Sequence, residues 1–212
     1  MKRIVGMATT KQRRKYSKLA IASLQDQCDG IILYDNDKEA INLTDNGKFY
    51  GLENLEEPVY YFSTDDDIIY PKDYIERTVE AIEKYNCIVT YHGRKLTGLN
   101  QNYYRDHKQY SCLLTIPRNV NIDVCGTGVT AFSTAYFNPV GLCYSEYKRM
   151  SDCLFSLEAA FNDKEILLLS HKKGDFIDLK VEKELSICAV ESGRCETQNT
   201  IADIIQKLKG CK

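Results

Sequence analysis

The sequence lacks any long apolar run. No stretch approaches the ~20 consecutive apolar residues that a membrane-spanning helix needs, and residues 1–3 lead into only a short apolar segment, so no export signal is expected. An excess of one charge is lacking too, because 28 basic and 30 acidic residues leave a net charge of −2. Such a balance does not attract nucleic acid or anionic lipid. We therefore expect a soluble, cytoplasmic protein with no membrane span and no nucleic-acid partner, whose substrate is a small molecule.

Paired cysteine motifs are also absent. The nine cysteines are odd in number, and no two have the C-x-x-C spacing of a zinc site. Several of them, including Cys87, Cys112 and Cys153, lie in apolar or amphipathic runs, where a free cysteine behaves as a small hydrophobic residue. This pattern predicts a reducing compartment and no disulfide framework.

What the sequence does contain is an alternation of strands and helices. Short apolar runs predict strands at residues 3–8, 31–34, 59–63 and 87–91, and periodic apolar positions predict two helices, one that Gly30 ends and one that runs to about Tyr85. The polar residues 38–58 predict a loop with one short element. This order is typical of an α/β domain in which a mostly parallel central sheet is flanked by helices.

The second half continues with fewer signals. Strands are predicted at residues 127–132 and 166–169, a helix over residues 151–161, and a C-terminal helix from the spacing of Ile201, Ile204, Ile205 and Leu208. A chain of 212 residues suits one domain. We divide it into residues 1–95, 96–175 and 176–212, the last being a C-terminal extension with its helix.

Polar side chains follow four of the predicted strands. Thr9 and Thr10, Asp35 and Asp37, the triplet of residues 65–67, and His92 each come just after a strand. In open α/β sheets, ligands bind at the carboxyl ends of the strands. Neither G-x-G-x-x-G nor G-x-x-x-x-G-K-[ST] occurs, so any phosphates must be held in another way.

The triplet Asp65, Asp66 and Asp67 is the most informative of these groups. Three adjacent carboxylates repel one another, and a cation offsets that cost. Carboxylate oxygens suit Mg²⁺ or Mn²⁺, which are commonly shared between one or two carboxylates and the phosphates of a substrate. The pattern therefore indicates a divalent metal that holds a diphosphate. The alternative is a solvated turn, or a cap for the helix that follows.

Three motifs carry a resemblance to a known family. Residues 61–71, YFSTDDDIIYP, with Asp73-Tyr74-Ile75 after them, are similar to a signature of microbial and virus-encoded GT-A glycosyltransferases, in which a D-x-D motif binds the metal. Residues 47–50, GKFY, and residues 91–94, YHGR, resemble two further elements of the same group. The resemblance covers roughly residues 1–175, is strongest over residues 45–95, and extends to the capsid-glycan glycosyltransferase domains of chloroviruses. It implies a GT-A (Rossmann-like) fold, with a nucleotide-binding half at 1–95 and an acceptor-binding half at 96–175.

The resemblance also implies roles for individual residues. Asp67 would ligate Mn²⁺ or Mg²⁺ directly, and Asp65 would contact the ribose of the donor or share the metal. His171, just beyond the last strand, would be a third metal ligand, and Asp66 would support the donor sugar or the geometry. Asp152, which opens the stretch SDCLFSLEAA with Ser151, would act as general base toward the acceptor. The remaining donor-binding candidates are Thr9, Arg13, Asp35, Asp37, Lys48 and His92.

Each of these roles has a structural alternative. Arg13 is more typical of a solvated helix start, and Asp152 is also typical of an N-cap or first-turn residue stabilised by the helix dipole. His171 precedes Lys172 and Lys173, as in an ordinary surface loop. Gly126 and Gly128 would let a sugar approach the backbone or form a tight turn. Of the tyrosines that could stack on a sugar, at positions 91, 103, 104 and 110, none is favoured.

We therefore expect a metal-dependent glycosyltransferase that moves a sugar from a nucleoside diphosphate donor, of the UDP-glucose or UDP-rhamnose type, to a hydroxyl of a glycan acceptor. Two alternatives are a nucleotidyltransferase that forms sugar nucleotides, although residues 7–14 lack its glycine-rich loop, and a catalytically inactive carbohydrate-binding domain. The chain could be one domain of a longer polypeptide and, if viral, would act in the host cytoplasm.

Overall fold

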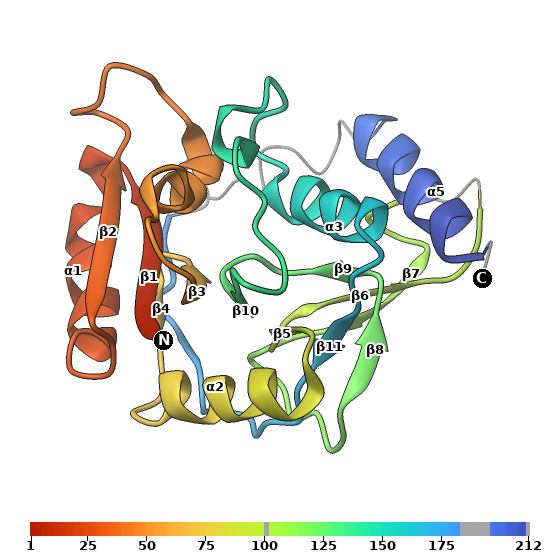
Figure 1. Cartoon of the computed structure of the whole chain (residues 1–212), viewed down its shortest axis with the longest axis horizontal. Helices are drawn as coiled ribbons and strands as arrows, with labels where there is room; N and C mark the ends of the chain where they lie inside the picture. Colours follow the sequence, from red (N-terminus) through yellow and green to blue (C-terminus); the bar gives the residue numbers. More distant parts are fainter. Residues whose placement is uncertain (100–101, 183–195, 211–212) are drawn as a thin grey trace.

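A seven-stranded sheet forms the centre of the computed structural model, which describes residues 1–99, 102–182 and 196–210 (Figure 1). The strand order is β2-β1-β3-β10-β5-β11-β8. All strands are parallel except β10 and β8. The predicted α/β class with a mostly parallel sheet is therefore confirmed. The strands are β1 (Lys2–Thr9), β2 (Gly30–Asp35), β3 (Val59–Thr64), β5 (Ile88–Thr90), β8 (Val120–Ile122), β10 (Val129–Ser133) and β11 (Ile166–Leu168).

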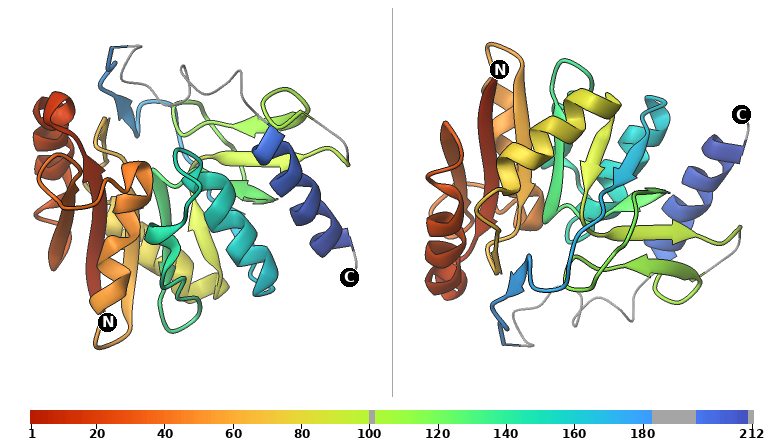
Figure 2. Two further views of the ribbon diagram at one scale, coloured as in Figure 1. Left: turned by 90° about the horizontal axis from the view of Figure 1, so that it is seen from above. Right: turned by 90° about the horizontal axis from the view of Figure 1, so that it is seen from below.

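Helical elements cover both faces of this sheet. Helices α1 (Arg14–Leu24) and α2 (Tyr74–Tyr85) pack on one face, and the 3₁₀ segment η2 (Thr44–Asn54) and helix α3 (Ser151–Phe161) on the other (Figures 1 and 2). The C-terminal helix α5 (Glu196–Gly210) packs on the outer side of α3. Two short 3₁₀ turns, η1 (Lys11–Arg13) and η3 (Leu142–Tyr144), complete the helical elements of the described residues. None of the described helices is long and apolar enough to cross a bilayer.

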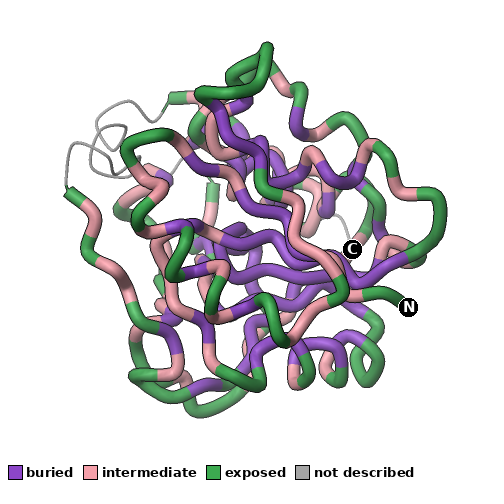
Figure 3. Tube along the Cα trace, turned by 90° about the vertical axis from the view of Figure 1, so that its left-hand side faces the viewer, coloured by how far each residue is buried: buried purple, intermediate pink, exposed green. Residues whose placement is uncertain are grey.

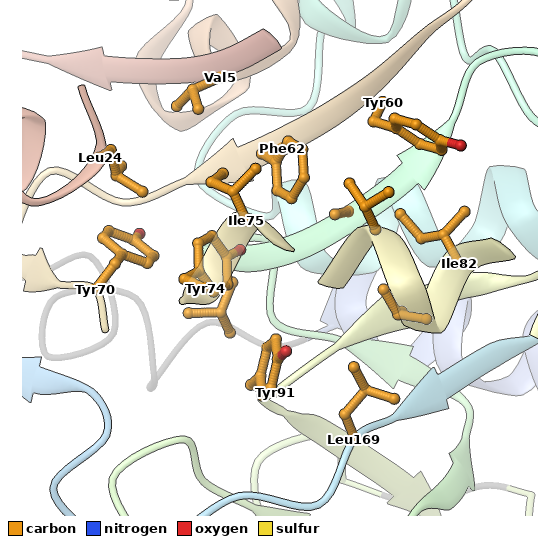
Figure 4. Close-up of a cluster of buried hydrophobic side chains, with 14 of the residues drawn as sticks. Val5, Leu24, Tyr60, Phe62, Tyr70, Tyr74, Ile75, Ile82, Tyr91 and Leu169 are labelled. Carbon is orange, nitrogen blue, oxygen red and sulfur yellow. The ribbon is translucent and has the colours of Figure 1, made fainter. Parts of the chain in front are cut away.

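The apolar stripe of α2 shows how the sequence builds the core. Tyr74, Ile75, Val79 and Ile82 recur at helical spacing and are buried against the sheet, with the Tyr74 ring 5.9 Å from that of Phe62 (Figure 4). Burying such a side chain fully contributes about 1.5–3 kcal/mol. Strand β3 is buried along its whole length, because helical elements lie on both of its faces. Figure 3 shows that buried residues run through the middle of the molecule and exposed ones lie around it. A strand with two covered faces reads as a continuous apolar run, which is why residues 59–62 could be recognised.

Several short elements were not predicted. A three-stranded sheet of β6 (Gly93–Leu96), β7 (His107–Tyr110) and β9 (Val124–Cys125) lies beside α5, and β4 (Ile68–Ile69) pairs with β12 (Ile177–Asp178). These strands are two to four residues long and carry no clear alternation. Segment η2 is longer than the short element expected over 38–58, because buried Phe49 and Leu52 anchor it to the sheet.

Candidate active site

The polar groups at the strand ends lie along one cavity. Strands β1, β2 and β3 end together, at Thr9, Asp35 and Thr64, and antiparallel β10 begins opposite Thr64. A cavity of about 530 Å³ opens at this edge, a size typical of small-molecule sites. One wall, from residues 8–67, includes Thr9, Thr10, Gln12, Arg13, Asn36, Lys48 and Asp65–Asp67. The other wall, from residues 94–198, includes Arg94, Tyr103, Tyr104, Thr127, Arg149, Met150, Ser151, Asp152, Cys153 and Gln198.

Asp66 is the buried member of the acidic triplet, and it links the triplet to neighbouring residues. It is 3 % exposed and accepts a hydrogen bond of 2.6 Å from the Thr9 hydroxyl. The Arg13 guanidinium donates to the same carboxylate, with Nε 2.9 Å from Oδ1. Burial alone would lower the pKa of Arg13, but Asp66 raises it above its ordinary value. Asp66 therefore fixes the turn after β3 to the turn after β1.

Asp65 and Asp67 are more open to the cavity, with side chains 39 % and 23 % exposed. Asp65 forms an ion pair with Lys48, and Asp67 accepts a 2.7 Å hydrogen bond from Arg13 Nη2. Burial favours a raised pKa for Asp65, but the attraction of Lys48 holds it below the ordinary value. For Asp67, burial and then repulsion by Asp65 raise the pKa to about 6. The raised pKa of Asp67 thus reflects the part of the repulsion between the carboxylates that Arg13 and Lys48 do not offset.

A divalent cation fits this arrangement. Three carboxylates face only two cationic side chains, so one negative charge is left over. Gly128 also leaves space for Asp65, since a Cβ at position 128 would lie 2.0 Å from Asp65 Oδ2. The described residues contain no group of three or more Asp, Glu, His or Cys side chains arranged as a complete metal cage. Asp65 and Asp67 would therefore hold Mg²⁺ or Mn²⁺ jointly with oxygens of a ligand, as these ions prefer.

Lys48 reaches the triplet because η2 approaches β1 closely. A Cβ at Gly6 would lie 2.1 Å from the Lys48 carbonyl oxygen, so only glycine permits this contact. The Tyr61 hydroxyl donates to the same carbonyl at 2.7 Å. Burial would lower the pKa of Lys48, but Asp65 raises it above its ordinary value, so the ammonium stays charged.

Asp152 stands on the opposite wall, in the first turn of α3. Its Oδ1 accepts hydrogen bonds from the Thr127 backbone N–H at 2.8 Å and from the Thr127 hydroxyl at 2.7 Å. Its Oδ2 lies 3.9 Å from Arg94 Nη1, and that same nitrogen donates to the Tyr103 hydroxyl at 2.6 Å. The N-cap position of α3 belongs to Met150, so Asp152 is not the helix cap. One carboxylate oxygen is thereby fixed, and the other is left facing a cation.

Asp45 connects the two walls. Its Oδ1 accepts a hydrogen bond from the Arg149 backbone N–H at 2.8 Å, and its Oδ2 one from the Ser151 N–H at 3.0 Å. Arg149 has a φ of 63°, a left-handed conformation that is unfavourable for a residue with a side chain. Asp45 thus holds the start of α3, and with it Asp152, against η2.

The aspartates that follow β2 serve in ion pairs and turns. Asp35 pairs with Arg14 at 2.7 Å, and although burial favours a raised pKa, the hydrogen bond from Arg14 lowers it. Asp37 accepts a 2.5 Å hydrogen bond from the Lys11 N–H. Neither lines the cavity, whereas Asn36 between them does. Asn36 holds the following loop through its Oδ1, which accepts from the N–H groups of Leu43 and Thr44.

The structure does not bring the two candidate histidines into the cavity. His92 lies behind the wall with Nδ1 3.8 Å from the Cys112 sulfur, and burial lowers its pKa although Asp152 opposes the shift. His171 forms a β-bridge with Ile116 and is not among the residues that line the cavity of the triplet. Its Nδ1 is 2.8 Å from the Leu169 carbonyl oxygen, and its ring packs against Tyr91 and Phe176 beside a second hollow. We therefore leave His171 out of the metal ligands proposed below.

Sequence reasoning missed several residues that line the cavity. Asn36 could have been found from its place between two aspartates after a strand, because alternate residues there point in different directions. Arg149 and Gln198 had no local signal, since they reach the cavity only through the packing of the loop before α3 and of α5.

No known protein family matches the sequence, and no curated protein matches it either. Among solved structures, the chain is similar to the inositol-1-phosphate CTP transferase from T. maritima, with a TM-score of 0.42 and 10 % sequence identity. The match covers 98 % of this chain and 78 % of that chain. A likeness at this level says nothing about activity.

Proposed function

We propose that the protein is a metal-dependent glycosyltransferase that moves a sugar from a nucleoside diphosphate donor, of the UDP-glucose or UDP-rhamnose type, to a hydroxyl of a glycan acceptor. The observation that carries the proposal is the two-sided cavity. One wall offers Asp65 and Asp67 with the cations Arg13 and Lys48, and the other offers Asp152. A sugar held between them would have its leaving group on one side and a base on the other.

The donor side suits a diphosphate. Arg13 and Lys48 are cations held in fixed positions by the carboxylates of the triplet, and both line the cavity. Arginine is well suited to phosphate oxygens because its planar fork donates two parallel hydrogen bonds. A divalent metal held by Asp65 and Asp67 would supply Lewis-acid stabilisation of the departing diphosphate.

On the acceptor side, Asp152 Oδ2 takes the proton of the acceptor hydroxyl in a reaction that inverts the anomeric carbon. The hydroxyl oxygen bonds to that carbon while the bond from the carbon to the diphosphate oxygen breaks, and the electron pair leaves with the diphosphate. The two hydrogen bonds from Thr127 to Oδ1 keep the carboxylate in one orientation during this transfer. Arg94 Nη1 lies 3.9 Å from Oδ2 of the same carboxylate and is itself positioned by the Tyr103 hydroxyl, to which it donates.

The test is Mn²⁺-dependent release of the free nucleoside diphosphate from a panel of sugar nucleotides, measured for the wild type and Asp67→Ala. Asp73→Ala is the matched control, because Asp73 is exposed and outside the cavity. We expect release from at least one donor that is lost in Asp67→Ala and kept in Asp73→Ala. Tight sugar binding without metal, combined with no Asp67-dependent release from any donor, would sink the proposal.

A parallel reaction separates the transferase from a nucleotidyltransferase. A sugar 1-phosphate and a nucleoside triphosphate are incubated with the protein, and pyrophosphate is measured. We expect none, because the turn from Thr10 to Arg13 has no glycine to wrap a triphosphate. Asp67-dependent pyrophosphate formation without diphosphate release from sugar nucleotides would replace the proposal with that activity.

A further inference from the structure

Gln198, in the first turn of α5, is a buried residue whose hydrogen bonding is incomplete. It lines the cavity and is 2 % exposed. Among the described residues, its Oε1 has no hydrogen-bond partner. Buried polar atoms are nearly always paired, so an unpaired one at a cavity wall indicates a missing ligand group. The missing group must donate a hydrogen bond.

Within the part of the chain that the structure describes, Arg94 on the same wall of the cavity has a hydrogen-bond donor without a partner, whereas Gln198 has an acceptor without one. Its Nη1 is engaged by Tyr103 and faces Asp152, but its buried Nε has no partner among the described residues. The missing group there must accept a hydrogen bond. A hydroxyl both donates and accepts, whereas an ionised carboxylate or phosphate only accepts and would leave Gln198 unpaired.

Helix α5 is held firmly enough to present Gln198. At its start, Asn199 Oδ1 accepts a 2.7 Å hydrogen bond from the Tyr103 backbone N–H. At its end, Lys209 Nζ donates to the Ile122 carbonyl oxygen at 2.9 Å and lies 3.2 Å from Asp123. Between these points, buried Ile201 and Ile205 pack in one cluster with residues of α3, along which α5 runs (Figure 2). The helix therefore positions both Gln198 and the Tyr103 that supports Arg94.

We propose that α5 completes the acceptor site, and that Gln198 selects a neutral, polyhydroxylated acceptor. One acceptor hydroxyl donates to Gln198 and another accepts from Arg94, which places the sugar ring beside Asp152. This inference rests on the proposed function, since it takes the cavity to be that of a sugar transferase. Gln198 is a specificity-determining residue and takes no part in releasing the diphosphate.

The test compares Gln198→Leu, which keeps the size of the side chain and removes its polar atoms, with Gln206→Ala, a change of the same residue type in the same helix outside the cavity. Methyl glycosides of neutral hexoses and of a hexuronic acid serve as acceptors. We expect Gln198→Leu to lower kcat/KM for the neutral glycoside by roughly three- to tenfold, the loss typical of one neutral hydrogen bond, with acceptor-free release of the diphosphate unchanged. Gln206→Ala should match the wild type. Equal losses in transfer and in acceptor-free release, or no loss at all, would overturn the inference.

Binding separates this inference from the proposed function. Ligand-observed NMR titration of the same neutral glycosides does not require turnover, and thermal melting confirms that each variant is folded. Weaker binding to Gln198→Leu than to the wild type supports the acceptor site, even if no donor is ever turned over and the proposed function fails. Equal binding to the two proteins, tighter binding of the uronic acid glycoside, or no binding of any neutral glycoside to the wild type shows that Gln198 does not select the acceptor.

Discussion

The replacement Gly128→Ala tests the geometry of the acidic triplet without removing any of its charges. The new Cβ would lie 2.0 Å from Asp65 Oδ2 and 2.4 Å from Asp65 Cγ. Ordinary contacts begin near 3.4 Å, so the carboxylate must move by about 1.4 Å, the difference between 3.4 and 2.0. A displacement of about 1 Å in a catalytic group costs on the order of 10²-fold in rate. We therefore expect Gly128→Ala to lower metal-dependent release of the diphosphate by about 10²-fold.

Stability should change far less than activity in this variant. The Asp65 carboxylate is the far end of a side chain that faces the cavity, so it can move without disturbing the core. Gly210→Ala is the control, because nothing lies within 4 Å of the added Cβ. Thermal melting shows whether Gly128→Ala is folded. If that variant does not fold, Asp65→Asn tests the same carboxylate directly. Release within threefold of the wild type, in both Gly128→Ala and Asp65→Asn, would refute the reasoning that Asp65 must stay in place.

Three further predictions concern pH, the anchoring of α5, and the metal. The raised pKa of Asp67, about 6, means that the folded state holds this proton more tightly than the unfolded state, so stability falls as the pH rises from about 4 to about 6. A difference of one pKa unit corresponds to about 1.4 kcal/mol, so Asp67→Asn should raise the free energy of unfolding by up to about 3 kcal/mol at pH 8 and by little at pH 4. Urea unfolding at the two pH values measures this gain, and an equal gain at pH 4 and pH 8 would contradict the raised pKa of Asp67. Asp123→Ala should destabilise the protein by about 2–4 kcal/mol, because buried Asp123 pairs with Lys95 and Lys209 and accepts from the Leu96 N–H, and unchanged urea unfolding would contradict that role. Mn²⁺ and UDP added together should raise Tm by roughly 5–10 °C at concentrations near a hundred times Kd, while chelation should remove the shift, and a shift with UDP alone that is insensitive to chelation would argue against a shared metal.

The layers of the fold could be predicted because their sequence patterns are strong. Residues 59–62 are a continuous apolar run because β3 is covered on both faces, and the apolar stripe of α2 follows helical spacing. The short strands β4 and β12 could not be predicted, because two-residue strands have no period and form only when distant segments meet. The same holds for η2, whose burial depends on the approach of its backbone to Gly6.

The candidate site was predictable in part. The triplet at the end of β3 and Lys48 could be proposed from sequence, and the structure places them along one cavity with Asp152. The partners of each carboxylate could not be predicted. Adjacent residues in the turn after β3 point in different directions, so Asp66 turns inward to Thr9 and Arg13 while its neighbours face the cavity. The place of His171 could not be predicted for a similar reason, since its bridge to Ile116 joins segments 55 residues apart in sequence.

The most direct measurement of the central claim is the anomalous signal of manganese in a crystal of the protein soaked with UDP and Mn²⁺. The account predicts a manganese peak in the cavity, in direct contact with the carboxylate of Asp65, Asp67 or both, and with oxygens of the diphosphate. A peak that contacts neither aspartate, or UDP bound in the cavity with no metal beside its phosphates, would contradict it.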